Sequence, residues 1–510
     1  MKLKLIHILI ALVCLWLLPK AQAVVPPPDG CYPNSTTAEG CKALQSLTTG
    51  AANTAIGWYS LFGTTTGSFN TAVGAGALDL NTADNNTAVG VAALLLNTTG
   101  TNNTANGVAA LVFNNTGEEN TATGAFALNN NTEGDFNTAD GAFALLANTT
   151  GERNTATGDS AMFSNTTGDR NTVIGNAALG LNTTGEDNTA IGAGALFSNN
   201  ASDNTAIGAD ALSDNTTGDQ NTAAGVEALS SNTMGAANTA MGYEALSSNT
   251  GGNLNTAIGF HALISNTTEG GNTAVGSEAL EHNTGGGGNT AVGDQALDSN
   301  TGGELNTAIG FAALFNNETG DSNIAVGFDA GDNVTTASNV ISIGSPGADV
   351  ADSCYIGNIW QQTGGSQAVY VNASGKLGAQ VSSRRFKEEI KPMERASEVI
   401  YRLTPVSFRY KQEIEPARPL AFGLIAEEVE EVDPDLVTRD QNGNAFSVRY
   451  DQVNAMLLNE FLKEHRTLRA QQKEIDALKQ ELKDQRALIE KVSERIGLDK
   501  AGPQLVMDKL

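Results

Sequence analysis

The sequence predicts a mainly β protein, in which a long repetitive β-roll of the β-solenoid class precedes a small α+β domain and a C-terminal coiled-coil helix. Three observations support this: a phrase that recurs every sixteen or seventeen residues, a change to charged, helix-forming composition near residue 380, and an apolar heptad pattern close to the end. The predicted division is a signal peptide at 1–23, an N-terminal segment at 24–52, the β-roll at 53–344, a connector with a β-hairpin at 345–381, the α+β domain at 382–455, a coiled coil at 456–498 and a tail at 499–510.

The first residues have the pattern of an export signal. Lys2 and Lys4 precede an apolar run at 5–18, and Ala21-Gln22-Ala23 offers small residues for cleavage before Val24. The run is shorter than the ~20 apolar residues that a spanning helix needs, although a membrane anchor is the alternative. We therefore expect a secreted or cell-surface protein with no membrane span in the mature chain.

Cysteine use agrees with export to an oxidising compartment. Cys31 and Cys41 are close in sequence and are predicted to form a disulfide that closes the loop between them. Cys354 is left without a partner. We expect it to be a buried thiol, although in a threefold assembly its copies could approach one another.

Charge and composition exclude several functions. The net charge of -27 argues against binding to nucleic acid or to anionic membranes, since both require a basic surface. Between Lys42 and Lys376 the only cationic side chains are Arg153 and Arg170. Aromatic residues make up 5%, which is too few for several large globular cores in 510 residues.

Metal and cofactor sites are not evident along the chain. The mature sequence contains only His261, His282 and His465, and none of them belongs to a recognisable catalytic triad. No group of cysteines and histidines has the usual metal-ligand spacing. We expect no cofactor, no metal and no external substrate.

The β-roll is predicted from the phrase Asn-Thr-Ala-Xaa-Gly-Xaa-Xaa-Ala-Leu. Its glycine recurs from Gly57 to Gly344 in seventeen steps, of which fifteen are seventeen residues long and two are sixteen. Such a small drift indicates one coil per copy, because a slipped register would expose every buried side chain downstream. Two short strands and two turns per coil are expected. The Leu position is filled in fifteen of seventeen copies, with Met162 and Gly331 as exceptions, so it is predicted to face inward.

A single roll of this kind buries mostly small side chains, so we expect three rolls to pack about one axis. At ~4.8 Å per coil, the seventeen copies would form a rod of roughly 80 Å. Asn and Thr side chains should form ladders from coil to coil, and the many Asn-Xaa-Thr sequences then reflect stacking rather than glycosylation. The phrase resembles the head repeats of trimeric autotransporter (YadA-like) adhesins, which implies adhesion and a cell-surface or glycan receptor.

After the repeats, Val369-Tyr-Val-Asn-Ala-Ser-Gly-Lys-Leu-Gly378 is typical of a β-hairpin, with its turn at 372–375. The most specific motif follows: Ser382-Ser-Arg-Arg-Phe-Lys-Glu-Glu-Ile390, with Leu403-Thr-Pro-Val-Ser-Phe-Arg-Tyr410, Phe422-Gly-Leu-Ile-Ala-Glu-Glu-Val429, Pro434 and Val448-Arg-Tyr-Asp451. Over about residues 380–470 these segments resemble the C-terminal intramolecular chaperone of phage tail spikes, endosialidases and myelin regulatory factors.

The resemblance implies a domain that trimerises, helps an upstream β-rich fibre to assemble and then cuts itself off with a serine and a lysine. On this sequence, Ser382 would be the nucleophile, Lys387 the general base, and the cut would fall between Val381 and Ser382. A lysine can accept the serine proton only when its amine is neutral. Burial and nearby arginines would favour that form. Ser383 stands where the family usually has Asp, which leaves open which of the two serines attacks and how efficient the cleavage is. A domain that trimerises without cutting is the alternative.

The last segment predicts a coiled coil. The first seam contains an apolar residue every seven positions: Phe461, Leu468, Ile475, Leu482, Ile489 and Ile496. The second seam is partly filled by Leu457, Leu478 and Val492. The alternative is an amphipathic helix packed on its own domain. Together these features predict an exported homotrimeric fibre with a self-cleaving assembly domain. An uncleaved structural surface protein is the second hypothesis, and an ice-binding solenoid a remote third.

Overall fold

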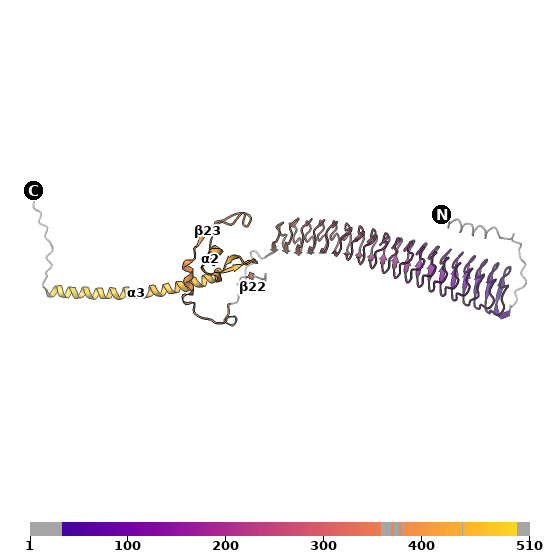
Figure 1. Ribbon diagram of the computed structural model, residues 1–510, viewed down its shortest axis with the longest axis horizontal. Coiled ribbons are helices and arrows are strands. Elements are labelled where there is room, and N and C mark those ends of the chain that lie inside the picture. The colour runs from indigo at the N-terminus through magenta and orange to yellow at the C-terminus, as the bar shows by residue number, and fades with distance from the viewer. Residues whose placement is uncertain (1–32, 359–368, 372–376, 380–381, 441, 497–510) are drawn as a thin grey trace. The chain divides into compact units, whose positions relative to one another are not determined.

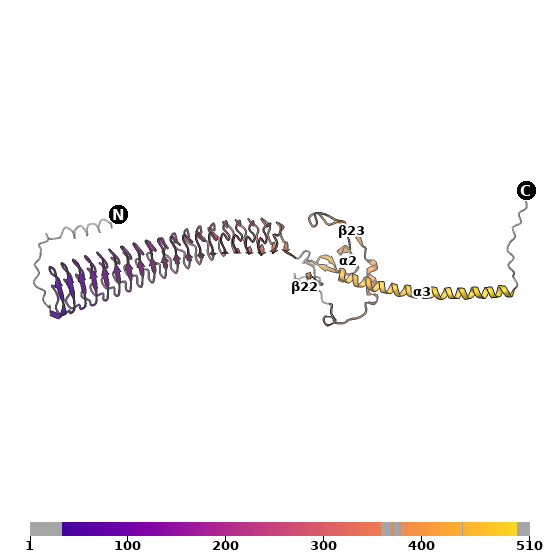
Figure 2. The same cartoon turned by 180° about the vertical axis from the view of Figure 1, so that it is seen from behind.

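The computed structural model describes residues 33–358, 369–371, 377–379, 382–440 and 442–496. Contacts divide the chain into two compact units, Met1–Gln362 and Thr363–Leu510 (Figures 1 and 2). The predicted signal peptide and its cleavage position lie outside the described residues. No helix among the described residues is long and apolar enough to cross a membrane.

The first unit is a β-solenoid, as predicted. Twenty strands form a single sheet, and each strand pairs in parallel with the strand that follows it in the chain, as in Ala55 opposite Ala72. The strands are β1 Thr37–Glu39, β2 Thr54–Ile56, β3 Thr71–Val73, β4 Thr87–Val89, β5 Thr104–Asn106, β6 Thr121–Thr123, β7 Thr138–Asp140, β8 Thr155–Thr157, β9 Thr172–Ile174, β10 Thr189–Ile191, β11 Thr205–Ile207, β12 Thr222–Ala224, β13 Thr239–Met241, β14 Thr256–Ile258, β15 Thr273–Val275, β16 Thr290–Val292, β17 Thr307–Ile309, β18 Ile324–Val326, β19 Ile341–Ile343 and β20 Cys354–Ile356.

The solenoid extends beyond the predicted repeat at both ends. β1 pairs with β2 and β20 pairs with β19. Both outer coils carry a degenerate phrase, since Gly40 lies one period before Gly57 and Gly357 lies thirteen residues after Gly344. Cys354 begins β20 and is exposed, so the expectation of a buried thiol is wrong for the single chain.

The prediction of two strands per coil is wrong: each coil has one. The Ala-Leu segment is a turn in which the leucine and the residue two places before it have positive φ, as at Leu111 (54°) and Ala109 (56°). A positive φ is unfavourable for β-branched side chains, and none occurs at either position in the phrase copies. Backbone bonds still join the coils here, for example from the Leu111 N–H to the Ala127 carbonyl at 3.0 Å.

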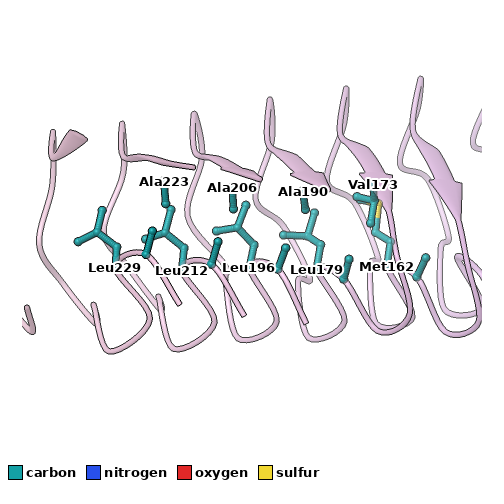
Figure 3. Close-up of a cluster of buried hydrophobic side chains, with 14 of the residues drawn as sticks. Met162, Val173, Leu179, Ala190, Leu196, Ala206, Leu212, Ala223 and Leu229 are labelled. Atoms are coloured by element: carbon teal, nitrogen blue, oxygen red, sulfur yellow. The ribbon is translucent and has the colours of Figure 1, made fainter. Parts of the chain in front are cut away.

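The core is a column of small and medium apolar side chains inside the solenoid. The middle residue of each strand points inward and meets the Ala-Leu pair from the opposite side of the coil, as Figure 3 shows for Ala206 and Leu212. Both are fully buried, and so is Met162, which replaces a leucine. A fully buried leucine contributes about 1.5–3 kcal/mol. One leucine per coil is therefore the main apolar contribution of each repeat.

The phrase glycines are required at the corner that follows each strand. Gly225 has φ +149°, and a Cβ there would lie 2.1 Å from the carbonyl oxygen of Gly242 in the next coil. A side chain would therefore separate adjacent coils as well as strain the backbone.

Two ladders of buried asparagines join the coils, as expected for asparagine. The asparagine of each phrase accepts a bond from the next coil, for example from the Asn70 N–H to Asn53 Oδ1 at 2.9 Å. The asparagine of each turn bonds side chain to side chain, as from Asn114 Nδ2 to Asn97 Oδ1 at 2.8 Å. These asparagines are almost completely buried. The threonine hydroxyls of the turns instead donate to backbone carbonyls of the next coil, as from Thr149 to Thr166 at 2.9 Å.

The second unit begins with a hairpin of β21 Val369–Val371 and β22 Leu377–Ala379, which pair antiparallel; its predicted turn lies outside the described residues. The remaining elements are the 3₁₀ helices η2 Arg384–Phe386 and η3 Glu394–Arg402, strands β23 Val406–Phe408 and β24 Ala421–Gly423, helix α2 Ala426–Val432, the 3₁₀ helix η4 Pro434–Leu436, strands β25 Val437–Arg439 and β26 Ala445–Val448, and helix α3 Tyr450–Arg495. At the N-terminal end of the solenoid, the 3₁₀ helix η1 Pro33–Ser35 precedes β1.

This unit has a small core of its own. Val429 of α2 packs with Leu436, Val437, Val448 and Val453, and the last of these comes from the first turns of α3. The core thus fixes the start of the long helix to the α+β domain.

Candidate active site in the C-terminal unit

The predicted nucleophile and base lie next to each other. Lys387 Nζ is 3.2 Å from Ser382 Oγ, within hydrogen-bond distance. A single 3₁₀ turn, η2, produces this approach: the Phe386 N–H donates to the Ser383 carbonyl at 3.0 Å, and the Lys387 N–H to the Arg384 carbonyl at 3.1 Å. A spacing of five residues across that turn thus brings the two side chains together. Val381, on the other side of the predicted cut, lies outside the described residues.

The pair is less buried than the sequence predicts. Every residue from 382 to 392 is exposed in the single chain, including Ser382, Lys387 and the arginines between them. The burial that was expected to favour a neutral Lys387 amine is therefore not found within one chain. Since desolvation is a principal way to remove the charge of a lysine, an active form of this site requires additional surface that covers the pair.

A second serine and lysine pair lies deeper in the unit. Ser397 of η3 is fully buried, donates a hydrogen bond to Glu460 Oε1, and accepts bonds from Asn459 Nδ2 at 2.6 Å and Lys463 Nζ at 3.4 Å. The Tyr401 hydroxyl donates to Glu460 Oε2 at 2.9 Å.

The Glu460 carboxylate contacts both members of this second pair. The Lys463 ammonium lies 2.6 Å from Glu460 Oε1. Lys463 first, and then the bonds from Ser397 and Tyr401, lower the pKa of Glu460 to about 2. The lysine is thus held as one half of an ion pair, and the serine proton points to a carboxylate. This arrangement joins η3 to α3 and does not prepare Ser397 for attack. Sequence analysis missed the network because its members are about sixty residues apart and no local motif marks them.

The motif residues around the core have identifiable contacts. The Tyr450 hydroxyl accepts the Leu424 N–H at 3.0 Å. A Cβ at Gly423 would lie 2.7 Å from that hydroxyl, so glycine is needed there. Arg449 donates from its backbone to the Leu436 carbonyl at 2.8 Å and from Nε to the Val437 carbonyl at 3.2 Å. Segments far apart in sequence therefore meet where the motifs predict one domain.

Residues 382–438 match the family model described as chaperone of endosialidase (Peptidase_S74). The match begins at Ser382 and supports an intramolecular chaperone domain in the C-terminal part of the chain. No curated protein and no solved structure matches the chain. The likeness of the repeats to adhesin heads therefore stays a prediction.

The predicted disulfide is also untested, because Cys31 lies outside the described residues. Cys41 is exposed. A pocket in the C-terminal unit is lined by residues of η3, the loop after it and α2, among them Arg402 and Glu428, and by Ile425, which precedes α2. Neither Ser382 nor Lys387 lines it.

Proposed function

We propose that the chain is a subunit of an exported homotrimeric fibre, whose C-terminal domain acts as an intramolecular trimerisation chaperone and then cuts the chain before Ser382. The match to the chaperone family model and the β-solenoid support a fibre-forming chain with an intramolecular chaperone domain. Trimerisation, cleavage and an adhesive role at the cell surface are parts of the proposal.

The observation that carries it is the exposed apolar seam of α3. Every residue from Glu464 to Arg495 is exposed in the single chain. The seam residues Leu468, Ile475, Leu482 and Ile489 are between 44% and 65% exposed. A helix with such a seam and no partner loses the burial that stabilises most helices in water. A parallel coiled coil buries the seam, and isoleucine at several of its positions is compatible with three strands.

The solenoid offers a second surface that requires a partner. The third strand position faces outward and is apolar and exposed in most coils: Ile56, Val89, Ile174, Ile207, Met241, Ile258, Val292, Ile309, Val326, Ile343 and Ile356. Beside it, the residue after the corner glycine is often a large apolar one, as at Trp58, Phe260 and Phe311. Exposed apolar surface of this extent, interrupted only at β5 to β8, is typical of an interface. Packing of three solenoids along these rows would cover it.

Cleavage would follow from assembly. Lys387 Nζ takes the proton of Ser382 Oγ, and the oxygen attacks the carbonyl carbon of residue 381. The peptide bond to the Ser382 nitrogen breaks, that nitrogen receives the proton, and an ester to Oγ forms. Water then hydrolyses the ester and leaves a carboxylate on residue 381. Because both side chains are exposed in one chain, we expect partner chains in the trimer to supply the desolvation, so that the cut occurs only after trimerisation.

The exposure of the pair favours one alternative, an uncleaved structural fibre with a trimerisation tail. Expression of residues 24–510 and denaturing gel electrophoresis separate the two. Cleavage yields fragments of 358 residues (24–381) and 129 residues (382–510). We expect Ser382→Ala and Lys387→Met to remain whole and trimeric. If wild type also remains whole while sedimentation shows trimers, the peptidase claim fails and the uncleaved fibre stands. If the protein is a stable monomer, both fail.

A further inference from the structure

Two histidines and several carboxylates gather on one side of four consecutive coils. His261 Nε2 lies 3.4 Å from Glu244 Oε2, and His261 Nδ1 lies 3.6 Å from Glu281 Oε1. In the next two coils, His282 Nδ1 lies 3.6 Å from Asp298 Oδ2, and a Glu281 carboxylate oxygen lies within 4.8 Å of the ligand atoms of both residues. These residues are about one repeat period apart in sequence. The solenoid therefore brings together side chains whose separation along the chain does not match that of a local metal-binding motif.

The geometry is suited to a metal ion. One ligand atom from each of Glu281, His282 and Asp298 lies within 4.8 Å of the others. A zinc ion with ligands at ~2.1 Å in tetrahedral geometry separates its ligand atoms by roughly 3.4 Å. The 3.6 Å between His282 and Asp298 is already close to that value. Small rotations of the exposed His282 ring and the half-buried Glu281 side chain would complete the set.

The Asp298 carboxylate is the most buried member of the cluster. Its residue is only 7% exposed, and its carboxylate points into the cluster. Among the described residues, this carboxylate has no lysine, arginine or backbone N–H partner. Two carboxylates at this distance repel each other, and a bound cation would offset that repulsion.

The sequence contains no cation of its own for this region. No lysine or arginine occurs between Arg170 and Lys376. Where the solenoid does stack acidic residues next to an arginine, they pair: Arg170 Nε is 2.7 Å from Asp187 Oδ1, and its guanidinium also contacts Glu186. The cluster around Asp298 has only imidazoles to balance its carboxylates.

We propose that Glu281, His282 and Asp298 form a binding site for a divalent transition-metal ion of the zinc class, completed by water. An imidazole nitrogen beside two carboxylate oxygens favours zinc, cobalt or nickel over calcium and magnesium, which prefer oxygen ligands alone. The ion would link two adjacent coils and offset the repulsion between Glu281 and Asp298. The site is independent of the chaperone domain and of cleavage.

Zinc binding to residues 24–510 would be measured by equilibrium dialysis and calorimetry in 150 mM salt, with Co²⁺ as a spectroscopic probe. We expect one ion per chain at this site, no displacement by excess Ca²⁺ or Mg²⁺, and Co²⁺ absorption bands typical of nitrogen and oxygen ligands. Asp298→Asn and His282→Ala should each weaken binding about tenfold or more. His465→Ala, on α3, is the matched control and should bind as wild type does.

Circular dichroism will show whether the variants fold. Asp298→Asn is expected to fold well, because it removes a carboxylate that is unfavourably placed without the ion. Binding that is displaced by Ca²⁺, that shows no unit stoichiometry, or that is the same in wild type and both site variants would overturn the proposal. Such results would mean that zinc binds only diffusely to an acidic surface.

Discussion

The asparagine ladders should contribute strongly to solenoid stability, and Asn131 tests this directly. Its Nδ2 donates to Asn114 Oδ1 at 2.8 Å and to the Gly134 carbonyl at 2.9 Å, and its Oδ1 accepts from Asn148 Nδ2 at 2.7 Å. The residue is fully buried. Asn131→Ala removes all three bonds from the interior.

The magnitude follows from the groups left without partners. The Gly134 carbonyl keeps a bond from Asn120 at 2.8 Å, so it remains satisfied. Asn114 Oδ1 and one N–H of Asn148 lose their partner. Each buried unsatisfied group costs about 1–3 kcal/mol, so the expected loss is on the order of 2–6 kcal/mol. A water that enters the space would bring the loss to the lower end.

The control is the neighbouring Asn130→Ala. Asn130 is half-buried, and no hydrogen bond of its side chain is found among the described residues. Its loss should be within about 0.5 kcal/mol. Both variants of residues 24–510 would be compared by urea unfolding, and hydrogen exchange would locate the change. We expect faster exchange confined to peptides that cover residues 114–148. Equal stability of the two variants would refute the ladder argument.

Three further predictions concern other contacts. Glu460→Ala should destabilise the C-terminal unit far more than Glu464→Ala on the exposed face of α3, as measured by thermal unfolding. Because the folded pKa of Glu460 is about 2, below its unfolded value, its stabilisation is complete above pH ~4.5 and falls as the pH drops toward 2, a dependence that Glu460→Gln should lack. The Asp349 carboxylate accepts hydrogen bonds from the backbone N–H groups of three successive residues, 335–337, and these bonds lower its pKa. Asp349→Ala should therefore lower the melting temperature at pH 7. Below the folded pKa of Asp349 the same substitution should have little effect. Ile475→Asp should dissociate the trimer in sedimentation experiments, whereas Lys479→Asp, outside the seam, should leave it intact.

The period of the repeat was enough to predict the solenoid, its buried leucines and its asparagine ladders. It was not enough to predict the backbone of the Ala-Leu segment. The Ala-Leu pair with its flanks is long enough for a short strand, yet leucine here adopts a positive φ at Leu212 and its equivalents. The absence of β-branched residues at these positions was the signal in the sequence, and it could have indicated turns.

Residues brought together by tertiary structure were harder to predict. Ser382 and Lys387 were found because a family motif places them within one turn. Ser397 and Glu460 carry no local pattern, and their contact depends on how η3 packs against α3. The cluster near Asp298 was missed for a different reason: ligand spacing was sought over a few residues, whereas in a solenoid the relevant spacing is one coil.

Because the coils are nearly identical, the proposed trimer needs a chaperone domain at one end of the solenoid to set the register of the three chains. A slip of one coil between neighbouring chains replaces each outward residue by a similar one, for instance Val292 by Ile309, and so changes the packing energy little. Repeats alone therefore specify chain register weakly. The outward row does carry one mark, since Asn106, Thr123, Asp140 and Thr157 interrupt it with polar residues. This polar interruption can favour the correct register only after the surrounding coils of neighbouring chains are in contact.

In the proposed trimer, a heptad seam joined to a folded domain would align three chains before any coil pairs. Since α3 is fixed to the α+β core through Val453 and Glu460, alignment of the helices also aligns the domains that follow the last coil. Pairing can then proceed from β20 toward β1 in a single register. In this proposal the chaperone is needed during assembly and not afterwards, because the buried asparagine ladders and the apolar rows, once covered, would hold the finished rod together. Removal of the domain by a cut before Ser382 would then leave a stable fibre.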